Sequence, residues 1–174
     1  FVIFALIYWA VRPFGADAQA GFGVGGRVMQ AIFLPAMAVG FSVAPIVGQN
    51  YGAGEAARVR ATFRTGAWMG AALMLAAMAL CHGLAEWLVR PFTHDGRAIA
   101  VGAQYLRYVS WNFVASGFIL TCSGLLQGLG NTWPSLWSSA SRVLTFALPV
   151  AWLAHRPGFA ITDIWVVSIS SVAL

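Results

Sequence analysis

Charged residues are scarce in this sequence. Ten basic and five acidic residues occur among 174, so 9% of the chain is charged, whereas about a quarter of an average soluble domain is charged. Hydrophobic residues make up 60% of the chain, and the mean hydropathy is +0.77. This composition excludes an ordinary soluble domain and indicates a chain that lies mostly within lipid.

Lysine is absent, and all ten basic residues are arginine. In a soluble chain a net charge of +5 would favour a nucleic-acid partner. Here the arginines lie mostly at the edges of apolar runs, where they meet lipid headgroups and water. The eight tryptophans are typical of interfacial anchors. We therefore expect the lipid bilayer as a partner and no nucleic acid.

Patterns of catalytic and metal-binding residues are also missing. Cys81 and Cys122 stand singly inside apolar segments, without CxxC spacing, and the three histidines lie in separate segments. No HExxH or GxSxG motif occurs. The glycine-rich stretch 21–26 follows no predicted strand, so it is not a nucleotide-binding loop. The sequence predicts no enzyme, no metal site and no cofactor.

Long uncharged runs are what the sequence has instead. The 21 residues between Arg64 and Glu86 carry no formal charge, and about 20 apolar helical residues cross a bilayer. Similar runs recur along the chain. We predict an all-α polytopic membrane protein with four complete and two truncated transmembrane helices: complete spans at about 18–48 (or from Arg27), 64–88, 105–127 and 134–153, and truncated ones at 1–11 and from 161 onward.

Both ends of the sequence lie within apolar runs. The first eleven residues have no initial Met and no basic region typical of a signal peptide, and the last ten are apolar but too few to span. We expect the sequence to be an internal part of a longer chain.

Two prolines, Pro35 and Pro45, fall inside the second predicted span. Proline removes a backbone donor and bends a helix. Such breaks persist in membranes where neighbouring helices or water satisfy the freed carbonyls. The prolines therefore predict either a bent helix that faces a cavity or a bend used for packing alone.

A conspicuous motif, GQNYGAGEAARVRATFR, covers residues 48–64. Its glycines are suited to end a helix, and its three arginines are expected within a short cytoplasmic loop. This orientation places the 128–134 turn inside and the 12–17, 90–104 and 154–163 loops outside. The loop-motif residues are Gly48, Gln49, Asn50, Gly52, Gly54, Arg58 and Arg60.

Candidate binding residues lie at membrane depth. Met29, Phe33 and Met37 recur every four residues on one helical face, with Gln30 beside them, and such a polarizable surface suits varied apolar ligands. The same stripe is also compatible with packing or lipid contact. Two polar residues in the fourth span, Asn112 and Ser116, could face a wet pocket or bond a neighbouring helix.

Glycine pairs at GxxxG spacing let helices approach closely. Gly66 with Gly70, and Gly124 with Gly128, have this spacing. We expect them to serve packing within one bundle and not dimerisation.

Two motifs together resemble one transporter family. Residues 29–60, MQAIFLPAMAVGFSVAPIVGQNYGAGEAARVR, resemble the second helix of a lobe and its following loop in the multidrug and toxic compound extrusion (MATE) family. QYLRYVSW, LLQGLGNTWPS and the stretch from Arg142 to Pro149 resemble the fourth and fifth helices of the same lobe. The resemblance covers essentially the whole chain.

The resemblance implies two six-helix lobes around a central cleft, of which residues 1–174 would form the carboxyl-terminal one, truncated at both ends. It implies a monomer in the cell (inner) membrane that exports cationic or amphiphilic drugs in exchange for Na⁺ or H⁺. Some members carry an acidic cation ligand midway along the fourth helix of this lobe. Here Tyr105 to Gln127 contains no Asp or Glu, and Asn112 is the nearest polar substitute.

Two other functions fit the same sequence. A lipid-linked precursor flippase of the same superfamily would need a cationic cavity, and Arg27 and Arg142 are the cations predicted at membrane depth. A non-transporting membrane scaffold would fit if the natural gene ended at these borders.

Overall fold

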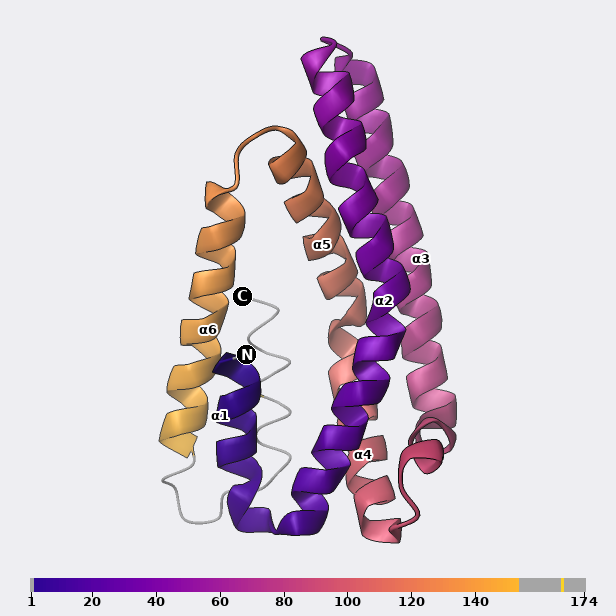
Figure 1. Ribbon diagram of the computed structural model, residues 1–174, viewed down its shortest axis with the longest axis vertical. Helices are drawn as coiled ribbons and strands as arrows, with labels where there is room; N and C mark the ends of the chain where they lie inside the picture. Colours follow the sequence, from indigo (N-terminus) through magenta and orange to yellow (C-terminus); the bar gives the residue numbers. More distant parts are fainter. Residues whose placement is uncertain (1, 154–166, 168–174) are drawn as a thin grey trace.

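The computed structural model describes residues 2–153 and Val167, and within them every regular element is a helix. The predicted sixth helix, from 161 onward, lies outside the described residues except for Val167. The elements, shown in Figure 1, are α1 (Val2–Val11), η1 (Arg12–Phe14), α2 (Ala16–Gly52), α3 (Ala56–Val89), η2 (Arg90–Phe92), α4 (Gly96–Val109), η3 (Ser110–Asn112), α5 (Phe113–Gly128) and α6 (Trp133–Leu153).

Three stretches of the fold are long and apolar enough to cross a membrane: Ala16–Gly52, Ala56–Phe92 and Gly96–Gly128. The 37 residues of α2 measure about 56 Å along the helix axis, well beyond a bilayer core of about 30 Å. The third stretch joins α4, η3 and α5 into one span. The predicted polytopic all-α class is confirmed.

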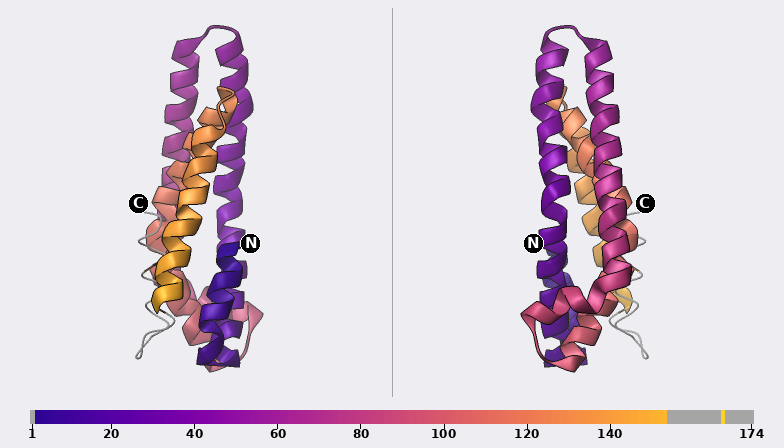
Figure 2. Two further views of the ribbon diagram at one scale, coloured as in Figure 1. Left: turned by 90° about the vertical axis from the view of Figure 1, so that its left-hand side faces the viewer. Right: turned by 90° about the vertical axis from the view of Figure 1, so that its right-hand side faces the viewer.

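The four elements α2 to α5 form the main bundle, and α1 packs beside α6. α2 and the α4–α5 span run in the same direction, and α3 runs opposite to both (Figure 1). Figure 2 shows α2 and α3 side by side, with their connecting turn extending beyond the α5–α6 connection. The α1–α2 and α3–α4 connections lie together at the other end of the bundle.

The loop predicted around the arginine cluster is shorter than expected. α2 continues to Gly52 and α3 begins at Ala56, so the 48–64 motif, with Arg58, Arg60 and Arg64, is helical apart from residues 53–55. Gly54, at φ +75°, makes the turn between the helices. The arginines predicted a loop, but alanine and arginine are good helix formers, so the helix continues through this charged segment.

The predicted 90–104 loop is also largely helical, because α4 begins at Gly96. The Asp95 carboxylate accepts a hydrogen bond from the backbone N–H of Arg97 at 3.0 Å, which is the usual N-terminal cap. The cap starts α4 well before the apolar run that indicated the span.

Close backbone contacts hold the bundle together. A Cβ atom on Gly124 would lie 2.5 Å from the carbonyl oxygen of Gly40, and one on Gly66 would lie 2.7 Å from the side chain of Val43. Both partners belong to α2, so the GxxxG pairs serve packing within the bundle, as predicted.

α2 contains both prolines and remains one continuous helix. In Figure 1 its lower and upper halves lean in opposite directions, so the helix axis changes direction near its middle, the part that holds Pro35. α3 has its own irregularity at Leu84, with φ −125° and ψ 21°.

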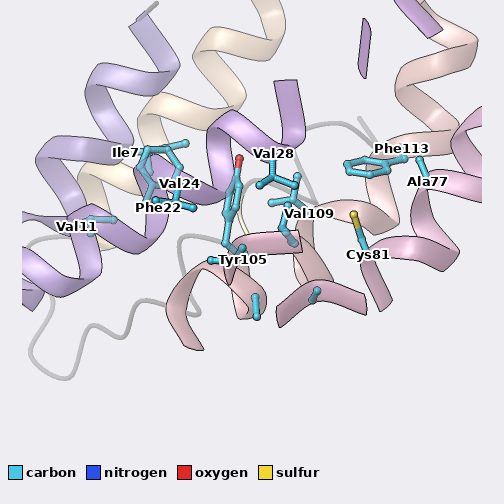
Figure 3. Close-up of a cluster of buried hydrophobic side chains, with 14 of the residues drawn as sticks. Ile7, Val11, Phe22, Val24, Val28, Ala77, Cys81, Tyr105, Val109 and Phe113 are labelled. Atoms are coloured by element: carbon cyan, nitrogen blue, oxygen red, sulfur yellow. The ribbon is translucent and has the colours of Figure 1, made fainter. Parts of the chain in front are cut away.

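The main cluster of buried hydrophobic residues draws on all six α-helices. Figure 3 shows Phe22 beside Ile7, Tyr105 reaching toward Val28, and Phe113 near the Cys81 thiol. Cys81 is a free, fully buried cysteine, consistent with its predicted place as a small apolar residue.

Candidate functional site

A pocket of about 500 Å³ lies between α1 and the first half of α2. Tyr8 comes from α1, and the remaining lining residues follow one another at helical spacing along α2. We call it the α1–α2 pocket. It is lined by Tyr8, Phe22, Gly23, Gly26, Arg27, Met29, Gln30 and Phe33.

Aromatic edge contacts build its inner wall. The rings of Tyr8 and Phe22 meet at a centroid distance of 4.9 Å and an angle of 76°, and Phe22 meets Tyr105 of α4 at 5.2 Å and 83°. Edge-to-face pairs at such distances are favourable. The chain of rings therefore links α1, α2 and α4 across the bundle.

Met29 is held against this wall by a polar contact. The Tyr105 hydroxyl donates a hydrogen bond to the Met29 sulfur at 3.1 Å. The sulfur is a weak acceptor, and the thioether side chain has several rotatable bonds. Met29 can thus change shape when a ligand enters.

Glycine makes room for both tyrosines. A Cβ atom on Gly25 would lie 2.6 Å from the Tyr105 ring, and one on Gly23 would lie 2.8 Å from the Tyr8 hydroxyl. The glycine-rich 21–26 stretch, which is not a nucleotide-binding loop, therefore lets α2 approach its neighbours closely around the pocket.

Arg27 gives the α1–α2 pocket a positive charge. It lines the pocket, lies exposed on α2, and forms no ion pair within the described part of the chain. No Asp or Glu belongs to the described lining. A cationic ligand would therefore find no counter-charge among the described lining residues.

The predicted lining residues are only partly brought together. Met29, Gln30 and Phe33 line the α1–α2 pocket, and Met37, one turn further along α2, does not. Phe33 also packs edge-on against Phe113, at a centroid distance of 5.1 Å and an angle of 89°. This contact connects the pocket wall to the start of α5.

Asn112 and Ser116 lie on that neighbouring segment. Asn112, 8% exposed, ends the η3 turn, and Ser116 is half-buried on α5. Neither belongs to the described pocket lining. Whether they contact a ligand stays a prediction.

A polar cluster at η3 was not foreseen from the sequence. The Ser110 hydroxyl donates to the Arg107 carbonyl oxygen at 2.9 Å and lies 3.1 Å from Nδ1 of His82 on α3. The His82 ring also meets Trp111 edge-on at 5.1 Å. Serine and histidine 28 positions apart carry no local signal of such a contact.

The predicted loop-motif residues lie far from the pocket, at the α2–α3 end of the bundle. The Asn50 side-chain amide donates to the carbonyl oxygen of Ile46 at 2.7 Å, and the Glu55 backbone N–H donates to the Asn50 carbonyl oxygen at 2.9 Å. The motif therefore forms the last turn of α2, the turn itself and the start of α3.

The family model of MatE matches residues 1–153. The chain belongs to the MatE family. With its long apolar helices, it is an integral protein of the cell membrane.

Curated relatives support this assignment. The chain is 32% identical to the probable multidrug resistance protein YpnP of Bacillus subtilis over 153 residues, which cover 84% of this chain and 34% of YpnP. It is 29% identical to the probable multidrug resistance protein NorM of Thermotoga maritima over 140 residues, which cover 80% of this chain and 30% of that protein. The chain thus spans about a third of the length of these relatives.

Solved structures share the fold. A crystal structure of MATE in the bent conformation aligns with a TM-score of 0.90 at 14% identity, over 99% of this chain and 38% of that one. An outward-facing multidrug resistance MATE transporter of the MOP superfamily aligns with a TM-score of 0.88 at 18% identity, over 99% of this chain and 39% of that one.

Proposed function

We propose that the chain is the carboxyl-terminal lobe of a secondary active multidrug exporter. The complete protein would carry cationic or amphiphilic compounds out of the cell in exchange for Na⁺ or H⁺, as a monomer and without catalysis. The observation that carries this proposal is the aromatic, methionine-containing α1–α2 pocket in a MatE-family chain.

The lining chemistry supports ligands of varied shape. Apolar and aromatic walls with few polar groups are typical of small-molecule sites, and about 500 Å³ falls within their usual range of about 300–1,000 Å³. Met29 can rotate away from Tyr105 at the cost of one weak hydrogen bond. Dispersion and ring contacts would then replace specific polar recognition.

Coupling to an ion needs a group that this pocket does not provide. The described lining has no carboxylate, and the 105–127 segment has none in its sequence. Na⁺ prefers oxygen ligands and H⁺ needs a titratable base. We propose that the coupling carboxylate lies elsewhere in the complete protein.

Arg27 favours a second candidate function. A cation in an apolar pocket suits the phosphate of a lipid-linked precursor, because arginine binds phosphate in a bidentate manner. One arginine supplies only a small share of the positive charge that a diphosphate needs. The flippase therefore stays the alternative. The other cation predicted at membrane depth, Arg142, has a side chain outside the described part of the structure.

Reconstituted transport separates the two functions. The full-length natural protein is reconstituted into proteoliposomes. The vesicles are loaded with ethidium, and Na⁺ and H⁺ gradients are imposed separately. Efflux driven by one gradient supports the exporter and names its ion. Absence of efflux under both, together with translocation of a fluorescent polyprenyl diphosphate, would replace the exporter with the flippase.

A further inference from the structure

A second hollow lies on the outer face of α3 and α5, away from the α1–α2 pocket. It is an open groove of about 560 Å³, remote in sequence from every residue of the α1–α2 pocket. We call it the Arg60–Arg64 groove. Its lining residues are Arg60, Phe63, Arg64, Ala67, Trp68 and Ala71 of α3 and Phe118 of α5.

The groove is charged at one end and apolar along the rest. Arg60 and Arg64 are exposed and one helical turn apart on the same face of α3. Below them, Ala67 and Ala71 follow at the same spacing and leave a shallow floor. Phe63 and Phe118 meet edge-on at a centroid distance of 6.1 Å, and Trp68, 73% exposed, forms another side.

The two arginines lack an ionic partner among the residues that the structure describes. The ion pairs found there are Arg97 with Asp17, at 3.7 Å, and Arg107 with Glu86, at 3.8 Å. Both lie toward the opposite end of the bundle, where α4 begins. The positive charge of the Arg60–Arg64 groove is therefore open to an external anion.

Helix packing places this charge at headgroup depth. A Cβ atom on Gly66 would contact Thr121 at 3.3 Å, and Thr121 lies seven residues, or about 10 Å, before α5 ends at Gly128. α3 runs opposite to α5, so Arg60, six residues before Gly66, lies about 9 Å higher. Arg60 is thus level with the end of the α5 span, and Arg64 lies one turn deeper.

The lower part of the groove reaches the hydrocarbon layer. Arg60 and Ala71 are eleven residues apart, about 16 Å along the helix axis, whereas the polar layer on each side of a bilayer is about 5–8 Å thick. Trp68 lies eight residues, about 12 Å, below Arg60, and so on the hydrocarbon side of the polar layer. The groove matches an amphiphile with its anionic group uppermost.

We propose that the Arg60–Arg64 groove binds one anionic phospholipid, with its phosphate between the two arginines and an acyl chain along Ala67 and Ala71. Arg58, Arg60 and Arg64 cluster within seven residues at the start of α3, and such a cluster next to a short turn predicts the cytoplasmic side, where the leaflet is rich in anionic lipid. The site is independent of the proposed transport function, since it involves none of the α1–α2 pocket residues.

Lipid selectivity tests the proposal directly. The full-length protein in detergent is titrated with phosphatidylglycerol or phosphatidylcholine of identical acyl chains, and bound lipid is counted by native mass spectrometry. We expect preferential binding of phosphatidylglycerol. In the double variant Arg60→Gln/Arg64→Gln its affinity should fall about five- to thirty-fold, with phosphatidylcholine unchanged.

A charge-matched control is available in the same helix. Arg58 lies two residues from Arg60, on the other side of α3, and neither Arg58 nor Arg90 lines the groove. The variant Arg58→Gln/Arg90→Gln removes the same net charge and should keep the selectivity. Equal loss in both double variants, or equal binding of the two lipids by the unmodified protein, would overturn the proposal.

A second readout leaves the arginines intact. Phosphatidylglycerol with brominated acyl chains should quench tryptophan fluorescence, and Trp68→Phe should remove a distinct part of that quenching. Quenching that is unchanged by Trp68→Phe would place the lipid elsewhere. Binding of inorganic phosphate as tight as that of phosphatidylglycerol would also contradict the proposal, because the acyl chain would then contribute nothing to the affinity.

Discussion

Arg27 sets the electrostatics of the α1–α2 pocket, because it is the charged residue of the described lining. In a low-dielectric setting a single uncompensated charge has a large effect on a charged ligand. Arg27 therefore disfavours cationic ligands and favours anionic groups. A cationic drug that binds here depends on the apolar and aromatic lining to offset that repulsion.

Replacing Arg27 by glutamine should change ligand preference. We expect Arg27→Gln to tighten ethidium binding by roughly three- to tenfold, equivalent to about 1 kcal/mol, and to weaken binding of an anionic amphiphile. Fluorescence titration of the full-length protein measures both. Arg12→Gln, at the same end of the bundle but outside the pocket lining, is the matched control, and an equal effect there would refute the local explanation.

Gly25 controls how closely Tyr105 approaches α2. A methyl group there would lie 2.6 Å from the ring, and overpacking of this kind costs about 1–3 kcal/mol. We expect Gly25→Ala to lower the thermal unfolding midpoint of the purified protein.

Gly83 on α3 provides the comparison for that substitution, because a Cβ atom there would meet no other atom within 4 Å. Gly83→Ala should leave the unfolding midpoint unchanged or raise it slightly, since alanine favours helix. A Gly25→Ala midpoint equal to or above that of Gly83→Ala would show that α2 and α4 are not tightly packed at this point.

Sequence reasoning found part of the pocket and missed part. The four-residue spacing of Met29 and Phe33 predicted a shared helical face, either a pocket wall or a packing surface, because such spacing is a local property. Both residues line the α1–α2 pocket, and whether they contact a ligand stays a prediction. Phe22 lies at helical spacing from both and shares that local signal. Tyr8 could not be found in this way, because its place comes from a ring contact between α1 and α2, and a tertiary contact leaves no periodic signal.

At the scale of the helices, apolar runs located the spans and misjudged their ends. The core of each described span agrees with its uncharged run, since insertion depends on composition. α3 begins at Ala56 and α4 at Gly96, earlier than predicted. Helix ends depend on caps and backbone propensity, so a helix can begin outside the hydrocarbon layer.

Pro35 belongs to this scale, because it affects the course of α2. It lies near the middle of the helix, where the axis changes direction in Figure 1. We expect Pro35→Ala to leave expression and insertion intact and to slow ethidium efflux several-fold, because alanine restores a backbone donor and straightens the helix.

Pro45 lies in the same helix, nearer its end, and serves as the control. Pro45→Ala should slow efflux less than Pro35→Ala. Normal efflux in a well-expressed Pro35→Ala variant would show that the bend serves packing alone.

At the scale of the whole molecule, the chain corresponds to one part of its longer relatives. It covers about a third of the length of its curated relatives and aligns with under two fifths of the solved MATE chains. The motif resemblance predicted this family and fold. The coupling ion and the substrates could not be predicted in the same way, since in the proposed two-lobe arrangement they depend on residues outside this chain.

The central claim is that drugs enter the α1–α2 pocket, and photoaffinity labelling tests it most directly. The full-length protein in proteoliposomes is illuminated with ethidium monoazide, and labelled peptides are mapped by mass spectrometry. We predict labels within residues 8–33 that unlabelled ethidium suppresses. Labels confined to other parts of the chain, with residues 8–33 recovered unmodified, would contradict the account.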